Sequence, residues 1–379
     1  MSAPVRIASV DILRGLVMVI MALDHVREFW SPTAASPEDL SQGDAALFLT
    51  RWITHLCAPA FMFLSGIGIC RYMEKAGKTK AAAFCLTRGF WLIFIEVVVM
   101  SFILTHGYDL IVLSVLWAIG WSMVLMSAFI WLPRVAIATI AVGMIGAHNL
   151  WSSISPETFP EYVAAIIHNT PFFIQPLGTL VTYSIVPWVG VMMAGFVAGS
   201  WFNEPSTERN ERLMKSAFVL LGLFVLVRTI NEYGDPNPWS IQANGGMFTA
   251  LSFVNVTKYP PSLMFLLLTT GITMLILSAI RREDSRINQI FLVYGRVPFF
   301  FYILHFGLVS LASWLWTLIQ FGEGINIAFT PAAARPSAYE PGLLRVYIVW
   351  MIILLITYYP CLWFGGYKRR NTSWWLGYL

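Results

Sequence analysis

The chain contains little charge for its length. Of its 379 residues, 24 are Lys or Arg and 20 are Asp or Glu, so charged side chains make up 12% of the sequence. A soluble domain carries about 25% charged residues. Hydrophobic residues make up 58% of the chain, and its mean hydropathy is +0.69. This composition excludes a soluble globular enzyme and a disordered chain, and it indicates that lipid is the solvent for most of the protein.

Cysteine and the familiar catalytic motifs are also scarce. The cysteines form no CxxC pair and have no histidine nearby at ligand spacing, which excludes a disulfide framework or a zinc site, and we expect no metal. No nucleophile elbow, P-loop or HExxH motif occurs, and no basic stretch is long enough to bind nucleic acid. The four cysteines are Cys57, Cys70, Cys85 and Cys361.

Long apolar runs are what the sequence does contain. Ten of them approach the 20 residues needed to cross about 30 Å of hydrocarbon. They predict an all-α polytopic membrane protein with about ten transmembrane helices, built as one domain over residues 1–379. The first run is too long for a cleaved signal peptide, so we expect it to remain. The predicted spans cover approximately residues 9–30, 47–70, 84–104, 111–131, 134–151, 181–202, 213–230, 261–280, 297–320 and 343–365.

The basic residues predict the orientation of these spans. If both termini are cytoplasmic, 18 of the 24 Lys and Arg residues fall on the inner side, as the positive-inside rule requires. We therefore expect a multi-pass protein of the bacterial inner (cytoplasmic) membrane. The outer loops are the longer ones, and long loops in a compact body are usually functional, so we expect the substrate on the outer side. These loops are 31–46, 152–180, 231–260 and 321–342.

The first predicted span carries ionisable residues, which are functional candidates inside a membrane. At 100° per residue, Asp11, Arg14 and His25 share one helix face, whereas Asp24 lies about 100° from His25. The helical rise separates Asp11 from His25 by about 21 Å. This stripe could line a path between the two membrane surfaces.

Two other spans carry a comparable polar face. Arg51 and His55 lie four residues apart in the second span, where Arg51 would keep His55 neutral, the form that a general base requires. A hydrogen-bonded core histidine is the alternative reading of His55. In the ninth span, Arg296 precedes the helix, and Tyr302 and His305 follow on neighbouring positions.

Each remaining candidate residue can also be explained by a purely structural role. Arg228, Lys258 and Tyr259 bracket the loop 231–260 and suit an anionic or sugar-like ligand, although interfacial anchoring would also explain them. Glu96 lies deep in the third span, where it must be protonated or paired, and an ion pair is as compatible with the sequence as catalysis.

Several motifs, in order along nearly the whole chain, form one recognisable set. They are Asp11 to Gly15, Met21 to His25, Thr50 to His55 with Ala58 and Pro59, Tyr183 to Gly190, Lys258 to Ser262, and Gly295 to Pro298 with Tyr302 to His305. The set resembles a bacterial membrane family grouped with the catalytic domain of heparan-α-glucosaminide N-acetyltransferase. The resemblance implies acetyl transfer from cytosolic acetyl-CoA to a glucosamine amine across the membrane, using a histidine near the first outer loop. Here the loop 31–46 contains no histidine, and His25 and His55 take that place by position only.

The resulting hypothesis is a membrane acyltransferase that uses acetyl-CoA or another acyl-CoA. The acceptor would be a hydroxyl or amine of a cell-envelope sugar or glycan at the outer face. The expected catalytic residues are His25, His55, Asp24, Arg51 and His305. The expected acyl-CoA-binding residues are Asp11, Arg14, Arg296 and Tyr302, and the expected acceptor-binding residues are Arg228, Lys258 and Tyr259.

Within that hypothesis, Asp11 would hold Arg14 against the phosphates or pantetheine of the acyl-CoA, and Arg51 or Tyr302 would stabilise the oxyanion. The rival hypothesis is a transporter or flippase for a polar envelope metabolite, and a third is an inactive membrane scaffold. A homo-oligomer is compatible with the sequence, which leaves the oligomeric state open.

Overall fold

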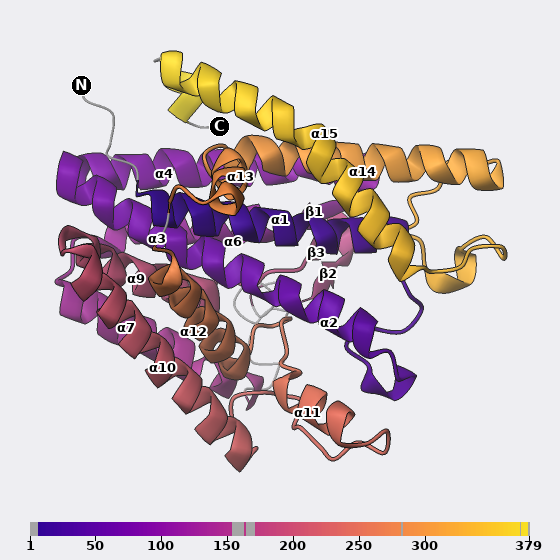
Figure 1. Cartoon of the computed structure of the whole chain (residues 1–379), viewed down its shortest axis with the longest axis horizontal. Helices are drawn as coiled ribbons and strands as arrows, with labels where there is room; N and C mark the ends of the chain where they lie inside the picture. Colours follow the sequence, from indigo (N-terminus) through magenta and orange to yellow (C-terminus); the bar gives the residue numbers. More distant parts are fainter. Residues whose placement is uncertain (1–6, 154–162, 164–170, 282, 372, 378–379) are drawn as a thin grey trace.

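The computed structural model describes residues 7–153, 163, 171–281, 283–371 and 373–377, and most of this part of the chain is helical (Figure 1). The longer helices are α1 Ala8–Trp30, α3 Cys57–Ala76, α4 Lys78–Ile95, α6 Val115–Phe129, α7 Arg134–Ala147, α9 Val186–Gly199, α10 Ser206–Ile230, α12 Leu263–Ala279, α14 Pro298–Phe321 and α15 Leu343–Arg370. The shorter helices are α2 Ala45–Ile53, α5 Ser101–Thr105, α11 Gly246–Val254 and α13 Arg286–Gly295.

A helix occupies each of the ten segments predicted to span the membrane. Within the described ranges, five continuous helical segments are long and apolar enough to cross a bilayer, and three further apolar helices are shorter. The finding supports a membrane protein, whereas ten spans with cytoplasmic termini stay a prediction. The five segments are Ala45–Ala76, Lys78–Thr105, Ser206–Ile230, Pro298–Phe321 and Leu343–Arg370.

The expectation of an all-α fold needs one correction. Three short strands, β1 Ile111–Leu113, β2 Phe172–Ile174 and β3 Thr179–Val181, form a sheet in the order β1-β3-β2. β1 pairs with β3 in parallel, and β2 pairs with β3 antiparallel. The predicted spans 111–131 and 181–202 therefore begin as strands. A short apolar run fits a strand as well as a buried helix, so periodicity alone did not separate them.

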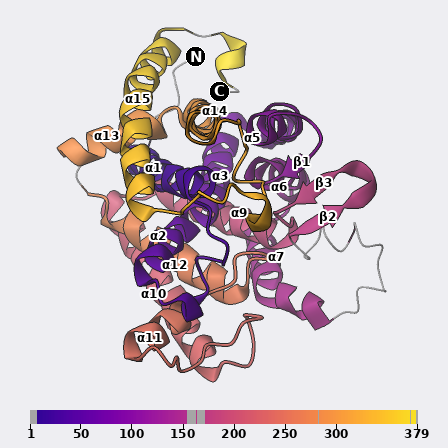
Figure 2. The same ribbon diagram turned by 90° about the vertical axis from the view of Figure 1, so that its right-hand side faces the viewer.

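The charged helix α1 lies at the centre of the bundle. The end view shows α1 and α3 surrounded by α14, α15, α6, α9 and α12 (Figure 2). Glycines bring α1 and α13 together: a Cβ atom on Gly15 would overlap the carbonyl of Phe291, and one on Gly295 would overlap the carbonyl of Asp11. This close crossing places the Arg14 end of α1 against the start of α14.

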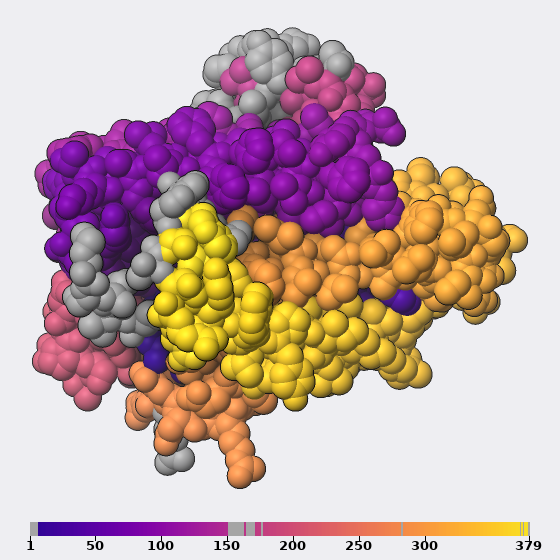
Figure 3. Space-filling model, turned by 90° about the horizontal axis from the view of Figure 1, so that it is seen from above, coloured from indigo at the N-terminus to yellow at the C-terminus, as the bar shows by residue number. Residues whose placement is uncertain are grey.

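Two loops from distant parts of the sequence pack together at the other end of α1. The Pro32 carbonyl accepts hydrogen bonds from Arg335 Nη1 at 2.8 Å and from the Tyr339 hydroxyl at 3.0 Å. Arg345 Nε donates to the Trp30 carbonyl at 2.9 Å. Of the predicted loop 152–180, residues 154–162 and 164–170 lie outside the described residues, and the described end of this segment contains β2 and the start of β3 rather than a loop throughout. Seen from above, α14 lies between α4–α5 on one side and α15 on the other (Figure 3).

Candidate functional site

Two cavities lie on either side of the Tyr302 side chain. The first, which we term the Arg14 cavity, has a volume of about 380 Å³ and is bounded by α1, α3, α4, α6 and α14. The second, the His25 cavity, has a volume of about 550 Å³ and is bounded by α1, the loop after it, and the segment around Lys258. Tyr302 on α14 and Val115 at the start of α6 line both cavities. These two side chains therefore form the partition between them.

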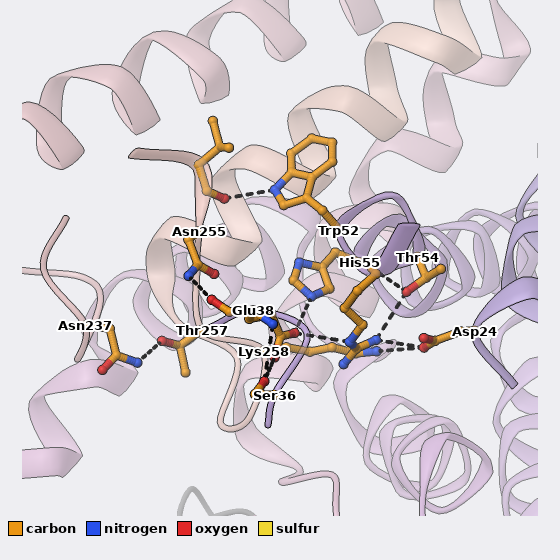
Figure 4. A network of polar contacts seen from close by, with 12 residues as sticks. Asp24, Ser36, Glu38, Trp52, Thr54, His55, Asn237, Asn255, Thr257 and Lys258 are labelled. Carbon is orange, nitrogen blue, oxygen red and sulfur yellow. Dashed lines mark hydrogen bonds and ion pairs between the residues drawn. The ribbon is translucent and has the colours of Figure 1, made fainter. Parts of the chain in front are cut away.

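The Asp24 carboxylate is the centre of a buried charge network at the His25 cavity (Figure 4). Its Oδ1 accepts a hydrogen bond from Arg27 Nη2 at 2.9 Å, and its Oδ2 accepts one from Arg51 Nη1 at 2.7 Å. Lys258 Nζ lies 4.0 Å from Oδ2. Three cations thus surround one carboxylate, which draws together α1, α2 and the segment before α12.

Glu38 extends this network from the loop that follows α1. Its Oε1 accepts from Arg51 Nε at 3.1 Å and lies 3.1 Å from His55 Nε2 (Figure 4). Burial by itself would raise the pKa of Glu38, but the hydrogen bond from His55 and the charge of Arg51 outweigh it, and the pKa lies well below its usual value. Glu38 is therefore ionised at neutral pH. His55 is 1% exposed and lines neither cavity. Its side chain contacts Glu38 instead.

His25 pairs with His305, a contact across 280 residues of sequence. His305 Nδ1 lies 2.8 Å from the Phe301 carbonyl, which can only accept, so this nitrogen carries the ring proton. In the neutral pair, His305 Nε2 is then an acceptor, and His25 Nδ1 donates its proton to it at 2.8 Å. The ring of His25 stacks on Phe306, with 3.9 Å between centroids. This hydrogen-bond chain leaves His25 Nε2 without a proton in a residue that lines the His25 cavity.

The Arg14 cavity is basic. Arg14 Nη1 donates to Asp11 Oδ1 at 2.7 Å, so the expected holding of Arg14 by Asp11 is present in the structure. Arg296 lines the same cavity, whereas Asp11 does not. Two further cations there, Arg88 and Lys368, were not among the predicted site residues, because their positions in the sequence indicate only the orientation of the spans. The four basic side chains of this cavity are Arg14, Arg88, Arg296 and Lys368.

The structure separates the three residues expected to bind the acceptor. Lys258 and Tyr259 line the His25 cavity, and Lys258 Nζ lies 5.1 Å from the centroid of the Tyr259 ring. Arg228 lines neither cavity and is 2% exposed. Its guanidinium donates to four backbone carbonyls within 3.1 Å, so we leave it out of the site. These carbonyls belong to Asn237, Ser252, Phe253 and Asn255.

Seven polar residues of the His25 cavity were not among the predicted site residues: Arg27, Glu28, Thr33, Ser36, Ser114, Thr182 and Tyr183. Glu28 follows Arg27 on α1, and its Oε1 lies 3.3 Å from Arg27 Nη2. Its position at a charged helix end is the sequence feature that could have identified it as a site residue. Ser114 has no charge and lies in none of the recognised motifs, whereas Tyr183 begins the motif Tyr183 to Gly190 but was given no role in the site. They lie in the segments before α6 and α9, and only the tertiary structure brings these segments to the cavity.

The arrangement suits a reaction between two ligands that arrive from different sides. One cavity offers cations for an anionic ligand, and the other offers an unprotonated imidazole nitrogen for proton abstraction. Tyr302 lies between them and offers a hydroxyl. Among the described residues, no group of three His, Cys, Asp or Glu side chains is placed to hold a metal ion.

Comparison with known proteins adds one match. The family model described as heparan-alpha-glucosaminide N-acetyltransferase, catalytic, matches residues 6–229. No curated protein matches the chain significantly. The matched range runs from the start of α1 nearly to the end of α10. It includes Asp24, His25 and Arg51, whereas Lys258, Tyr302 and His305 lie beyond it.

Proposed function

The chain belongs to the heparan-alpha-glucosaminide N-acetyltransferase catalytic family, and from this premise we propose that it moves an acetyl group from acetyl-CoA across a membrane to a sugar. The family supports a membrane acetyltransferase in general terms. The donor, the acceptor and the residue roles are our proposal. The observation that carries it is the pair of cavities that meet at Tyr302, one basic and one with an unprotonated histidine nitrogen.

The donor would occupy the Arg14 cavity. Coenzyme A carries phosphates, and Arg and Lys side chains are the residues that bind phosphate most often. The four cations of this cavity, with Arg14 held by Asp11, would meet those phosphates while the pantetheine arm extends to Tyr302. This places the Arg14 cavity on the cytoplasmic side, in agreement with the basic loops, in what we propose is a bacterial inner membrane.

The acceptor would occupy the His25 cavity from the outer side. His25 Nε2 takes the proton of the acceptor hydroxyl or amine, whose oxygen or nitrogen attacks the thioester carbonyl carbon. Tyr302 donates a hydrogen bond to the oxyanion. The C–S bond then breaks, the thiolate takes up one proton to leave as CoA, and His25 returns to its neutral form. His305 orients His25, and the Asp24 network with Lys258 and Tyr259 surrounds the acceptor.

We assign the base to His25 rather than His55 because only His25 lines a cavity. The test uses purified protein in nanodiscs, acetyl-labelled acetyl-CoA and glucosamine as the acceptor probe. We expect His25→Ala to lower kcat by about 10² to 10⁴ while leaving the Kd for acetyl-CoA unchanged. His106→Ala is the matched control, because His106 binds Ser310 outside both cavities, and we expect its rate within about twofold of wild type. Full activity of His25→Ala would overturn the assignment.

Two cavities separated only by the side chains of Tyr302 and Val115 also favour the second candidate, a transporter or flippase of a polar envelope metabolite. Binding separates the two candidates. An enzyme binds acetyl-CoA and releases CoA only when an acceptor is present. A transporter reconstituted in vesicles would move labelled glucosamine without acetyl-CoA, and that result would favour transport.

A further inference from the structure

A closed loop, residues 257–262, carries Lys258 to the His25 cavity, and we term it the Lys258 loop (Figure 4). The Ser262 N–H donates to the Thr257 carbonyl at 2.9 Å, which closes the loop. Lys258 is 7% exposed. Among the described residues, its ammonium group makes one ion pair, with Asp24 Oδ2 at 4.0 Å, and no hydrogen bond. Its N–H donors are therefore available to a ligand in the cavity.

One buried carboxylate, Asp235, joins the two ends of the Lys258 loop. Its side chain is 2% exposed. Oδ2 accepts from the Thr257 N–H at 3.0 Å and from the Ser262 hydroxyl at 2.7 Å. Oδ1 accepts from the Thr257 hydroxyl at 2.8 Å and from the Asn237 N–H at 2.9 Å. Asp235 lines neither cavity, so its route to the site is the loop.

Arg228, which the proposed mechanism does not use, supplies the opposite charge for Asp235. Its Nη1 lies 4.0 Å from Asp235 Oδ1, and both side chains are 2% exposed. The same nitrogen donates to the Asn237 carbonyl, and Nη2 donates to the Asn255 carbonyl. A buried carboxylate needs a nearby cation and several hydrogen bonds to remain charged. Arg228 and Asp235 thus form the base on which the Lys258 loop is held.

We propose that Asp235 is a positioning residue for the acceptor, which fixes the Lys258 loop so that the Lys258 ammonium group faces the His25 cavity. The ammonium group then donates to an oxygen of the acceptor without a rearrangement of the loop. Such preorganisation lowers the entropic cost of binding. The inference rests on the proposed function, because it takes the His25 cavity as the acceptor site.

Asp235→Asn tests this role with almost no change in shape. Each carboxylate oxygen accepts one backbone N–H, from Thr257 or from Asn237, and a backbone N–H cannot accept in return. An amide has one acceptor oxygen, so in either orientation its NH2 group faces an N–H. We expect Asp235→Asn to raise the KM for glucosamine about tenfold, the effect of losing one hydrogen bond to a charged group, with the KM for acetyl-CoA within about twofold of wild type.

Asn231→Gly is the matched control in the same segment, 231–260. Asn231 makes two side-chain bonds to the backbone of Trp239, at 2.9 and 3.0 Å, and it lines neither cavity. Its φ is 61°, a conformation that glycine adopts without strain. We expect both KM values within about twofold of wild type. An equal rise of the KM for glucosamine in Asn231→Gly and Asp235→Asn would contradict the proposal, because any damage to the segment would then have the same effect.

A double-mutant cycle with Lys258→Met tests whether Asp235 acts through Lys258. We expect the effect of Asp235→Asn on the KM for glucosamine to fall below about twofold in the Lys258→Met background, because both changes remove one contact. An undiminished effect there would overturn the proposal. Thr257→Val removes only the Thr257 hydroxyl bond and keeps the carboxylate, and we expect it to raise this KM about threefold. It decides the question if Asp235→Asn does not fold.

Hydrogen exchange followed by mass spectrometry supplies a readout that does not depend on catalysis. The Thr257 amide donates to Asp235 and the Ser262 amide to the Thr257 carbonyl, so we expect Asp235→Asn to speed their exchange about tenfold and Asn231→Gly to leave it unchanged. If wild-type protein transfers no acetyl group, the proposed function fails, and the exchange still decides whether Asp235 holds the loop. If transfer occurs and Asp235→Asn alters neither the exchange nor the KM for glucosamine, the proposed function stands and the positioning role is wrong.

Discussion

At the residue scale, the site depends on a small number of buried charges that neutralise one another. Arg51 is the link, because it donates to Asp24 through Nη1 and to Glu38 through Nε, and it is only 5% exposed. A buried charge without a partner is strongly unfavourable. The network therefore holds the loop after α1 in place as well as shaping the His25 cavity.

Replacing Arg51 alone should destabilise the protein more than replacing both Arg51 and Asp24. We expect Arg51→Ala to lower the free energy of unfolding by about 3 to 5 kcal/mol, because Asp24 keeps its charge and loses its shortest hydrogen bond. The double variant Asp24→Asn with Arg51→Gln should recover much of that loss. Thermal or denaturant unfolding in nanodiscs measures both. Equal destabilisation by the single and double variants would show that the charge of Asp24 is not the cause.

At the element scale, the close crossing of α1 and α13 positions the basic cavity. Gly15 and Gly295 let the two backbones touch, and Arg14 lies beside the crossing with its Nη1 at 3.5 Å from the Gly295 carbonyl. α13 leads directly into α14, which carries Tyr302 and His305. The spacing between α1 and α13 therefore affects both cavities.

A side chain at Gly15 should separate these helices. We expect Gly15→Leu to cost at least the 1 to 3 kcal/mol typical of overpacking, because the group it meets is backbone and cannot rotate away. The Kd for acetyl-CoA should rise with it. Gly143→Leu on α7 is the matched control, since a Cβ atom there meets nothing within 4 Å, and we expect no loss of stability. Wild-type stability and acetyl-CoA affinity in Gly15→Leu would contradict the role of the crossing.

At the scale of the whole molecule, the proposal requires the two cavities to open to opposite sides of the membrane. The four native cysteines are free and buried, so they should contribute little background to labelling with an impermeant maleimide. Ser65 lines the Arg14 cavity, and Thr33 lines the His25 cavity. They offer one reporter position for each side.

We expect Thr33→Cys to be labelled in intact spheroplasts and Ser65→Cys only in inverted vesicles. The physical reason is that the basic loops hold the Arg14 end of the bundle in the cytoplasm. Labelling of Ser65→Cys from outside, with Thr33→Cys protected, would reverse the orientation. The cysteine-bearing proteins are compared with wild type in the same preparations to subtract the native thiols.

Sequence alone was enough to predict the class of the protein, the places of its helices and about half of the charged residues at the two cavities and in the Asp24 network. These follow from composition, from apolar runs and from the cost of charge in lipid, all of which are local properties. It did not separate β1 and β3 from the apolar helices that follow them, because a three-residue apolar run is compatible with both structures.

Which of the candidate residues contact one another could be seen only in the folded protein. In the structure, His25 contacts His305 and His55 contacts Glu38. Arg228 donates its hydrogen bonds to backbone carbonyls. The tertiary structure also brought the Glu96 carboxyl group to the backbone N–H of Ser114, a residue that lines the His25 cavity. The physical reason is that helical periodicity gives the face on which a side chain lies, whereas its partner depends on how distant helices pack. In a membrane, where each buried charge needs a partner, that packing separates the residues of the site from those that hold it together.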